Sequence, residues 1–129
     1  MMPPPIERWH AIAKSRDTRA LSELLADEAI FESPVVHTPQ VGKAITQKYL
    51  GAAMQVLNNG SFEYLNEWYG ESSAVLEFRC TCDGIVINGV DIIEWNAAGK
   101  ISHFKVMVRP LKAINALHEM MGKMLQRAG

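Results

Sequence analysis

A single carboxylate stands on an apolar strand face in the segment NGVDIIEWNAAGKISHFKVMVRP, residues 88–110. In an alternating strand, Asp91 shares its face with Ile93 and Trp95. A carboxyl group in apolar surroundings loses solvation of its charged form, so its pKa rises and it can act as an acid or a hydrogen-bond donor. Asp91 is therefore the first candidate for chemistry. The competing interpretation is that Asp91 accepts a hydrogen bond from the Trp9 indole or a backbone amide and organises the core.

The candidate base is His37, in the loop PVVHTP of residues 34–39. We expect this loop to border the mouth of a cavity, and histidine titrates near physiological pH. The alternative is an exposed loop histidine without a chemical role. The four histidines show no ligand spacing with cysteine or carboxylate, so the sequence predicts no metal site. No cofactor is expected.

The composition predicts one soluble globular domain of 129 residues, with 48% hydrophobic and 21% charged residues. A net charge of −1 does not indicate binding to nucleic acid or to an anionic membrane surface. No apolar run approaches the roughly 20 residues of a membrane span. Cys80 and Cys82 lie two apart on a predicted strand, where a disulfide would be strained, so we interpret both as free thiols of a cytoplasmic protein.

The hydrophobic periodicity predicts helices first and strands afterwards. The expected elements are an extended lead-in over residues 1–5, a helix to about Lys14, a second helix capped by Asp17 or Thr18, a strand over 28–32, a helix over 43–57, strands over 62–69, 74–82, 85–95 and 101–109, and a C-terminal helix over 111–127. The helix over 43–57 is expected to turn one stripe inward, formed by Ile45, Tyr49, Ala52 and Val56. The C-terminal helix also has one apolar stripe, formed by Leu111, Ile114, Leu117, Met121, Met124 and Leu125. This order indicates an α+β fold. We expect one curved antiparallel sheet wrapped around the N-terminal helices, a cone that can keep a cavity inside.

Three segments carry a resemblance to a known family: SRDTRALSELLADEAIFESP, VGKAITQKYL and VDIIEWNAAGKISHFKVMVRP. They resemble the nuclear transport factor 2-like superfamily, and more closely its small bacterial branch of ketosteroid isomerases and SnoaL-like polyketide cyclases. The likeness spans about Ile6 to Pro110. It implies a single SnoaL-like domain over residues 1–129 with a cystatin-like roll, and a homodimer paired through the outer face of the sheet.

The comparison with the isomerases concerns three positions. Asp91 falls where that family keeps a protonated carboxylic acid that donates to a substrate oxyanion. Trp9 falls where the family has a tyrosine, the second donor, and Ser33 falls where it has the aspartate base. Trp9 retains an N–H donor, whereas Ser33 needs an activating partner to act as a base.

The leading hypothesis is a protein that binds a small, apolar or carbonyl-containing molecule in the cone around the single buried carboxylate. The expected ligand-binding residues are Trp9, Ser33, Tyr49, Phe78, Asp91, Trp95 and Phe104. One alternative is an isomerase, dehydratase or cyclase that transfers protons on a carbonyl substrate, with Asp91 as acid and His37 as base. A second alternative is a non-catalytic structural or protein-binding module whose core fills the cone. The Met-rich C-terminal helix is expected either to cover the cavity or to extend the dimer contact.

Overall fold

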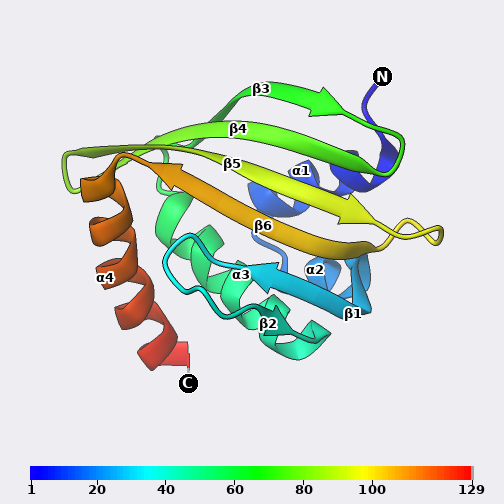
Figure 1. The fold of residues 1–129 in the computed structure, drawn as a ribbon, viewed down its shortest axis with the longest axis horizontal. Helices are drawn as coiled ribbons and strands as arrows, with labels where there is room; N and C mark the ends of the chain where they lie inside the picture. Colours follow the sequence, from blue (N-terminus) through cyan, green and yellow to red (C-terminus); the bar gives the residue numbers. More distant parts are fainter. Residues whose placement is uncertain (129) are drawn as a thin grey trace.

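The fold pairs one six-stranded sheet with four helices (Figure 1). The computed structural model describes residues 1–128. In chain order the elements are α1 (Pro4–Ser15), α2 (Thr18–Leu24), β1 (Leu25–Glu32), β2 (Gln40–Val41), α3 (Lys43–Leu57), β3 (Glu63–Tyr69), β4 (Ser73–Cys82), β5 (Ile85–Trp95), β6 (Ile101–Arg109) and α4 (Leu111–Ala128). The α+β prediction with a curved sheet is confirmed.

The sheet is mixed, which corrects the expectation of a purely antiparallel one. Its strand order is β2-β1-β6-β5-β4-β3, and β1 pairs with β6 in parallel. The strands β3 to β6 follow one another through short turns and pair antiparallel as predicted. The segment that connects β1 to β6 includes α3 and four strands, and such a long crossover permits parallel pairing.

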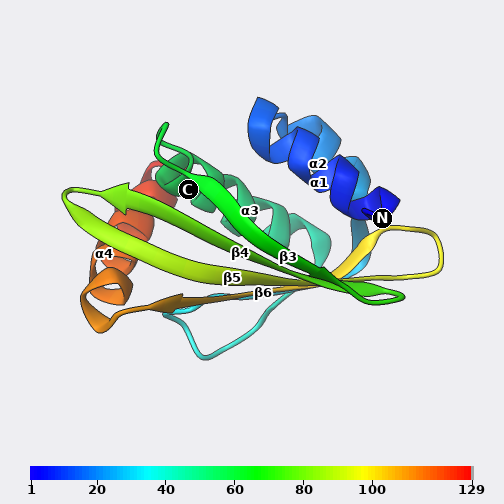
Figure 2. The same cartoon turned by 90° about the horizontal axis from the view of Figure 1, so that it is seen from above.

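Helices α1, α2 and α3 cover one face of the sheet (Figure 2). Helix α1 begins at Pro4, inside the segment expected to be an extended lead-in. Proline is tolerated in the first helical turn because the backbone N–H groups of that turn have no acceptor within the helix, so the N–H that proline lacks is not needed there. Helix α2 is capped as predicted: Asp17 Oδ1 accepts hydrogen bonds from the backbone N–H groups of Arg19 and Ala20 at 3.0 and 3.2 Å.

Helix α3 has the predicted bounds, and Ala52 of the predicted inner stripe is buried, but the rest of its buried face lies beside that stripe. Its buried residues include Thr46, Leu50 and Met54, whereas Ile45, expected inside, is 36% exposed. The Thr46 hydroxyl donates to the backbone carbonyl of Ala29 in β1 at 3.1 Å, so this buried hydroxyl group has a hydrogen-bond partner. The buried face of α3 thus includes a threonine, which a stripe chosen by hydrophobicity alone leaves out.

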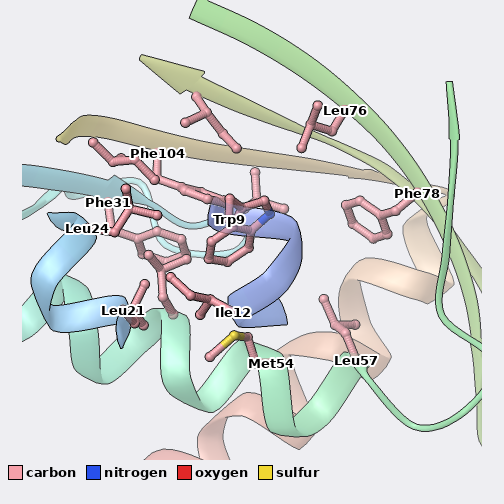
Figure 3. Packing of buried hydrophobic residues seen from close by; sticks show 14 of the residues in the cluster. Trp9, Ile12, Leu21, Leu24, Phe31, Met54, Leu57, Leu76, Phe78 and Phe104 are labelled. Atoms are coloured by element: carbon pink, nitrogen blue, oxygen red, sulfur yellow. The ribbon is translucent and has the colours of Figure 1, made fainter. Parts of the chain in front are cut away.

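The core lies between α1, α3 and the inner face of the sheet (Figure 3). Trp9 of α1 sits at its centre, and its ring meets Phe104 of β6 edge-on at 4.9 Å between centroids. Met54 and Leu57 point toward it from α3. The inward side chains of the long strands alternate with outward ones, as in the burial pattern of β4.

Helix α4 lies at the end of the sheet where β4 turns into β5 (Figure 1, Figure 2). Ala113 and Leu117 are buried, whereas Leu111, predicted on the inner stripe, is 71% exposed. Leu111 is the first residue of the helix, directly after the bend at Pro110. None of the helices within residues 1–128 combines the length and the apolarity that a membrane crossing requires.

Candidate functional site

Strand β5 places Asp91 at the centre of the inner sheet face. Asp91 lies opposite Leu76 of β4 and Val106 of β6, both apolar and buried, and only 6% of Asp91 is exposed. The next cross-strand pair on this face is Ile93 of β5 with Phe104 of β6. The strand alternation therefore fixes a carboxyl group among hydrocarbon side chains.

A chain of two hydrogen bonds ends at this carboxyl group. The Trp9 indole N–H donates to the Tyr64 hydroxyl oxygen at 2.8 Å, and the Tyr64 hydroxyl donates to Asp91 Oδ2 at 2.7 Å. The three residues come from α1, β3 and β5, so the chain forms only in the folded protein. Among the described residues, no hydrogen bond engages Asp91 Oδ1, which leaves one carboxyl oxygen for another partner.

Burial dominates the electrostatics of the site. Loss of solvation raises the pKa of Asp91 from 3.8 to about 7, and the hydrogen bond from Tyr64 opposes that rise. Burial, with the nearby Asp91 carboxylate, also raises the pKa of Tyr64 well above its ordinary value. Tyr64 is therefore a permanent donor near neutral pH, whereas Asp91 exists in both protonation states.

A small pocket of about 60 Å³ reaches Asp91. Its wall is almost entirely apolar and contains residues of α1, the loop after β1, α3, β3, β5, β6 and α4. The lining residues are Trp9, Ala13, Phe31, Ser33, Pro34, Val35, Leu50, Ala53, Met54, Leu57, Asn58, Phe62, Tyr64, Asp91, Phe104, Val106, Leu117 and Met121.

The structure brings four of the sequence-predicted site residues to this pocket: Trp9, Ser33, Asp91 and Phe104. The Ser33 side-chain oxygen accepts a hydrogen bond from the backbone N–H of Val35 at 3.1 Å, which closes the turn after β1. No described carboxylate or histidine activates Ser33 by a hydrogen bond.

The other predicted lining residues lie elsewhere. Tyr49 packs against Phe31, with 6.0 Å between the ring centroids, and does not line the pocket. Phe78 stacks on Phe62 at 5.2 Å and is covered by it. Trp95 follows an irregularity in the β5–β6 register and is only half-buried at the end of the strand.

His37 does not share the pocket with Asp91. It is exposed in the loop after β1 and lines a separate outer depression with Glu32, Lys105 and Met107. The loop turns outward after Val35, so the intended base and the buried acid face different surroundings. The structure thus separates the acid–base pair that the sequence suggested.

Sequence reasoning missed Tyr64, the residue that joins Trp9 to Asp91. The available signal was its position on the same strand face as Phe62, since a tyrosine directed into a core needs a partner for its hydroxyl. His10 of α1 also belongs to these surroundings, with its ring edge-on to Tyr64 at 4.9 Å. His10 Nε2 lies 2.8 Å from Glu67 Oε2, without the alignment of a hydrogen bond.

The described residues include no group of three or more histidine, cysteine, aspartate or glutamate side chains placed to hold a metal ion. Cys80 and Cys82 are buried free thiols on the inner face of β4. Burial raises the pKa of Cys80 to about 12, so this thiol stays protonated and packs as a small apolar residue.

The chain belongs to the SnoaL-like domain family, which matches residues 6–104 and so extends from α1 into the first part of β6. No curated protein matches the chain. The family assignment agrees with the resemblance found in the sequence and leaves helix α4 outside the matched region.

Solved structures of this fold agree closely. A steroid delta-isomerase from Pseudomonas aeruginosa is 32% identical, with a TM-score of 0.90 over 96% of this chain and 90% of that chain. An uncharacterised protein with a cystatin-like fold from Silicibacter pomeroyi DSS-3 is 30% identical, with a TM-score of 0.87 over 95% and 85% of the two chains. A putative polyketide cyclase from Sinorhizobium meliloti, at 17% identity and a TM-score of 0.67 over 82% and 95%, shares the fold.

Proposed function

We propose that this protein binds a small, neutral, largely apolar molecule that carries one carbonyl or hydroxyl group. The observation that carries the proposal is the Trp9–Tyr64–Asp91 chain, which ends in an uncommitted carboxyl oxygen inside an apolar pocket. Pockets of this composition bind by apolar contact and orient the ligand through a few polar groups.

The charges of the pocket favour a neutral ligand. Its described lining contains no lysine, arginine or histidine, so an anionic ligand would meet the Asp91 carboxylate without a compensating cation. A protonated Asp91 donates to a carbonyl oxygen, and an ionised Asp91 accepts from a hydroxyl group. The preferred ligand therefore changes across the pKa of Asp91, about 7.

The test uses cyclohexanone as a compact ketone and measures its Kd by calorimetry between pH 6 and pH 9. Wild-type affinity should fall about tenfold per pH unit above the pKa of Asp91, because only the protonated acid donates to the ketone. Asp91→Asn keeps an amide donor without a titration, so its affinity should not change with pH. Asp27→Asn, with a side chain 97% exposed, is the matched control.

An identical pH profile in Asp91→Asn and wild type would show that Asp91 does not contact the ketone. Absence of binding in all three proteins would favour a structural module.

The second candidate is a proton-transfer enzyme, and the 32% identity with the steroid delta-isomerase favours it. With His37 outside the pocket, Asp91 is the carboxylate available to both take and return a proton. Its carboxylate would remove a proton from the carbon beside a carbonyl, giving an enolate, and the protonated acid would return that proton to another carbon. In deuterated buffer, wild type should exchange the α-protons of cyclohexanone faster than Asp91→Asn does. Equal rates would eliminate this candidate.

We also propose a homodimer that pairs through the outer face of the sheet. The strand registers place Trp68, Val75 and Ile92 in one row, with Met107 opposite Val90 in the next. Trp68 and Met107 are 56% and 52% exposed, which is unusual for large apolar side chains grouped on one face.

The charges at the two ends of this outer face support self-pairing. Arg109 lies in one row with Asn88 and with Arg79, which pairs with Glu63 at 2.8 Å, and Glu94 lies three rows away beside His103. A two-fold axis through the middle of the sheet would bring the arginine end of one copy onto the glutamate end of the other.

Replacement of Met107 by glutamate should abolish this dimer. A carboxylate at the centre of an apolar contact is desolvated without a partner, and symmetry introduces two of them, so we expect the dimer Kd to rise about 100-fold or more. Sedimentation equilibrium measures the effect. Lys123→Glu, on the exposed side of α4, is the control and should leave the mass unchanged. A monomeric wild type, or an unaffected Met107→Glu dimer, would contradict the proposed interface.

The buried thiols support a cytoplasmic location for the protein. Cys80 and Cys82 are unpaired although they lie two residues apart on one strand face. Free thiols persist where the compartment is reducing. Localisation of a tagged copy of the full chain by cell fractionation tests this location.

A further inference from the structure

Two side chains of α4 close the pocket around Asp91. Leu117 and Met121 lie four residues apart, so they project from the same helix face. Leu117 is 3% exposed, Met121 is half-buried, and both line the pocket together with Trp9 and Asp91. Helix α4 lies outside the region that matches the SnoaL-like domain family, although the steroid delta-isomerase structure aligns with 96% of this chain.

The pocket is smaller than a ring-shaped ligand. Its volume is about 60 Å³, whereas an engineered cavity that accepts benzene measures about 150 Å³. Typical ligand sites measure roughly 300–1,000 Å³. A ligand with more than a few heavy atoms can therefore enter only if one wall of the pocket moves.

The other walls are tied to the sheet or to each other by hydrogen bonds. Helix α1 is held by the Trp9 indole on Tyr64, and by Asn58, whose side-chain amide donates to the Ala13 carbonyl at 2.7 Å. Helix α3 is held by Thr46 on Ala29. Displacing either helix would break buried hydrogen bonds, which is costly.

Helix α4 has no such tie. Over residues 111–126, the side-chain ion pair found is Lys123 with Glu119 at 3.4 Å, within the helix itself, and no side chain there hydrogen-bonds to another element. Apolar contacts with α3, β5 and β6 hold α4 in place. These contacts are non-directional, and methionine adapts its shape more readily than other apolar side chains, so this wall can shift without breaking a hydrogen bond.

We infer that α4 is the movable wall of the pocket and that Leu117 and Met121 determine the size of ligand that it accepts. This inference rests on the proposed binding function. It assigns the ligands to two classes: molecules of a single ring or less, which need only a small displacement of this wall, and fused ring systems, which bind only when Met121 and the helix move further outward. The space that a larger ligand takes is the space that these two side chains now fill.

The test compares two neutral ketones of different size, cyclohexanone and 2-acetylnaphthalene. Met121→Ala and Leu117→Ala should each tighten binding of 2-acetylnaphthalene about tenfold, since removal of several methylene-sized groups opens room for the second ring. Cyclohexanone affinity should change less than about threefold. Ile114→Ala is the matched control, because Ile114 is a half-buried residue of α4 that does not line the pocket.

A second readout follows the helix directly. Hydrogen exchange of the α4 amides in the wild-type protein should change by about fivefold or more when 2-acetylnaphthalene binds, while the α3 amides stay constant. This measurement needs no variant, so it holds even if Leu117→Ala fails to fold.

The outcomes distinguish the inference that α4 moves from the proposed binding function on which it rests. If both ketones bind with the predicted Asp91 dependence but the size preference is the same in Met121→Ala, Ile114→Ala and wild type, the inference about α4 is overturned and the binding function stands. If neither ketone binds to any of these proteins, the binding function is overturned, and the inference with it.

Discussion

Asp91→Asn is expected to stabilise the folded protein, by an amount that grows between pH 4 and pH 8. The pKa of Asp91 is about 7 in the folded protein and near 3.8 when exposed, so the native state holds a proton that the unfolded state releases over this interval. The contribution of Asp91 to stability is therefore greatest below pH 3.8 and falls as the pH rises toward 7. The interval is about three pH units, and at about 1.4 kcal/mol per unit the upper limit of the loss is about 4 kcal/mol.

Asparagine removes this loss because its side chain does not ionise, while its carbonyl oxygen can still accept the hydrogen bond from Tyr64. Urea unfolding of both proteins at pH 4, 6 and 8 measures the difference in the free energy of unfolding. The exposed Asp27→Asn serves again as control, since it should show no such trend. A difference between wild type and Asp91→Asn that stays constant with pH would refute the raised pKa of Asp91.

Tyr64→Phe is expected to destabilise the protein by about 3 kcal/mol at pH 9. The change removes the donor to the buried Asp91 carboxylate and leaves the Trp9 N–H without its acceptor, and each loss costs about 1–3 kcal/mol. The loss should be smaller at pH 5, where Asp91 is protonated. The hydrogen bond from Tyr64 lowers the pKa of Asp91, so its removal should raise that pKa further above 7.

Tyr69→Phe is the matched control, on the same strand. Its hydroxyl donates to Glu67 at 2.7 Å near the surface, where water can replace a lost partner. Urea unfolding gives the stabilities, and carbon-detected NMR titration gives the pKa of Asp91 in each variant. If Tyr64→Phe costs no more than Tyr69→Phe at pH 9, the hydrogen-bond chain does not support the site.

Much of the fold was predictable because its signals are local. The period-two pattern of the last two strands, the turn at Gly99 and the bounds of α3 all depend on neighbouring residues, and the structure has them close to where the sequence indicates. The parallel pairing of β1 with β6 joins distant segments, and no short-range pattern encodes it.

The site was only partly predictable for the same reason. Asp91 is conspicuous as a carboxylate on an apolar strand face, and Trp9 and Ser33 were identified through the family resemblance. His37 was placed by loop proximity, but the direction in which a loop turns depends on the packing at its two ends, and the loop turns outward.

The sequence by itself determined the order of the elements, the α+β class, the SnoaL-like family and the presence of the Asp91 carboxyl group on the inner face of the sheet. Tertiary structure decided the partners of that carboxyl group. Tyr64 reaches Asp91 because β3 and β5 both pair with β4, and Trp9 reaches Tyr64 because α1 packs across the same sheet face. Hydrogen bonds between residues 27 and 55 positions apart depend on chain topology, which local periodicity does not specify.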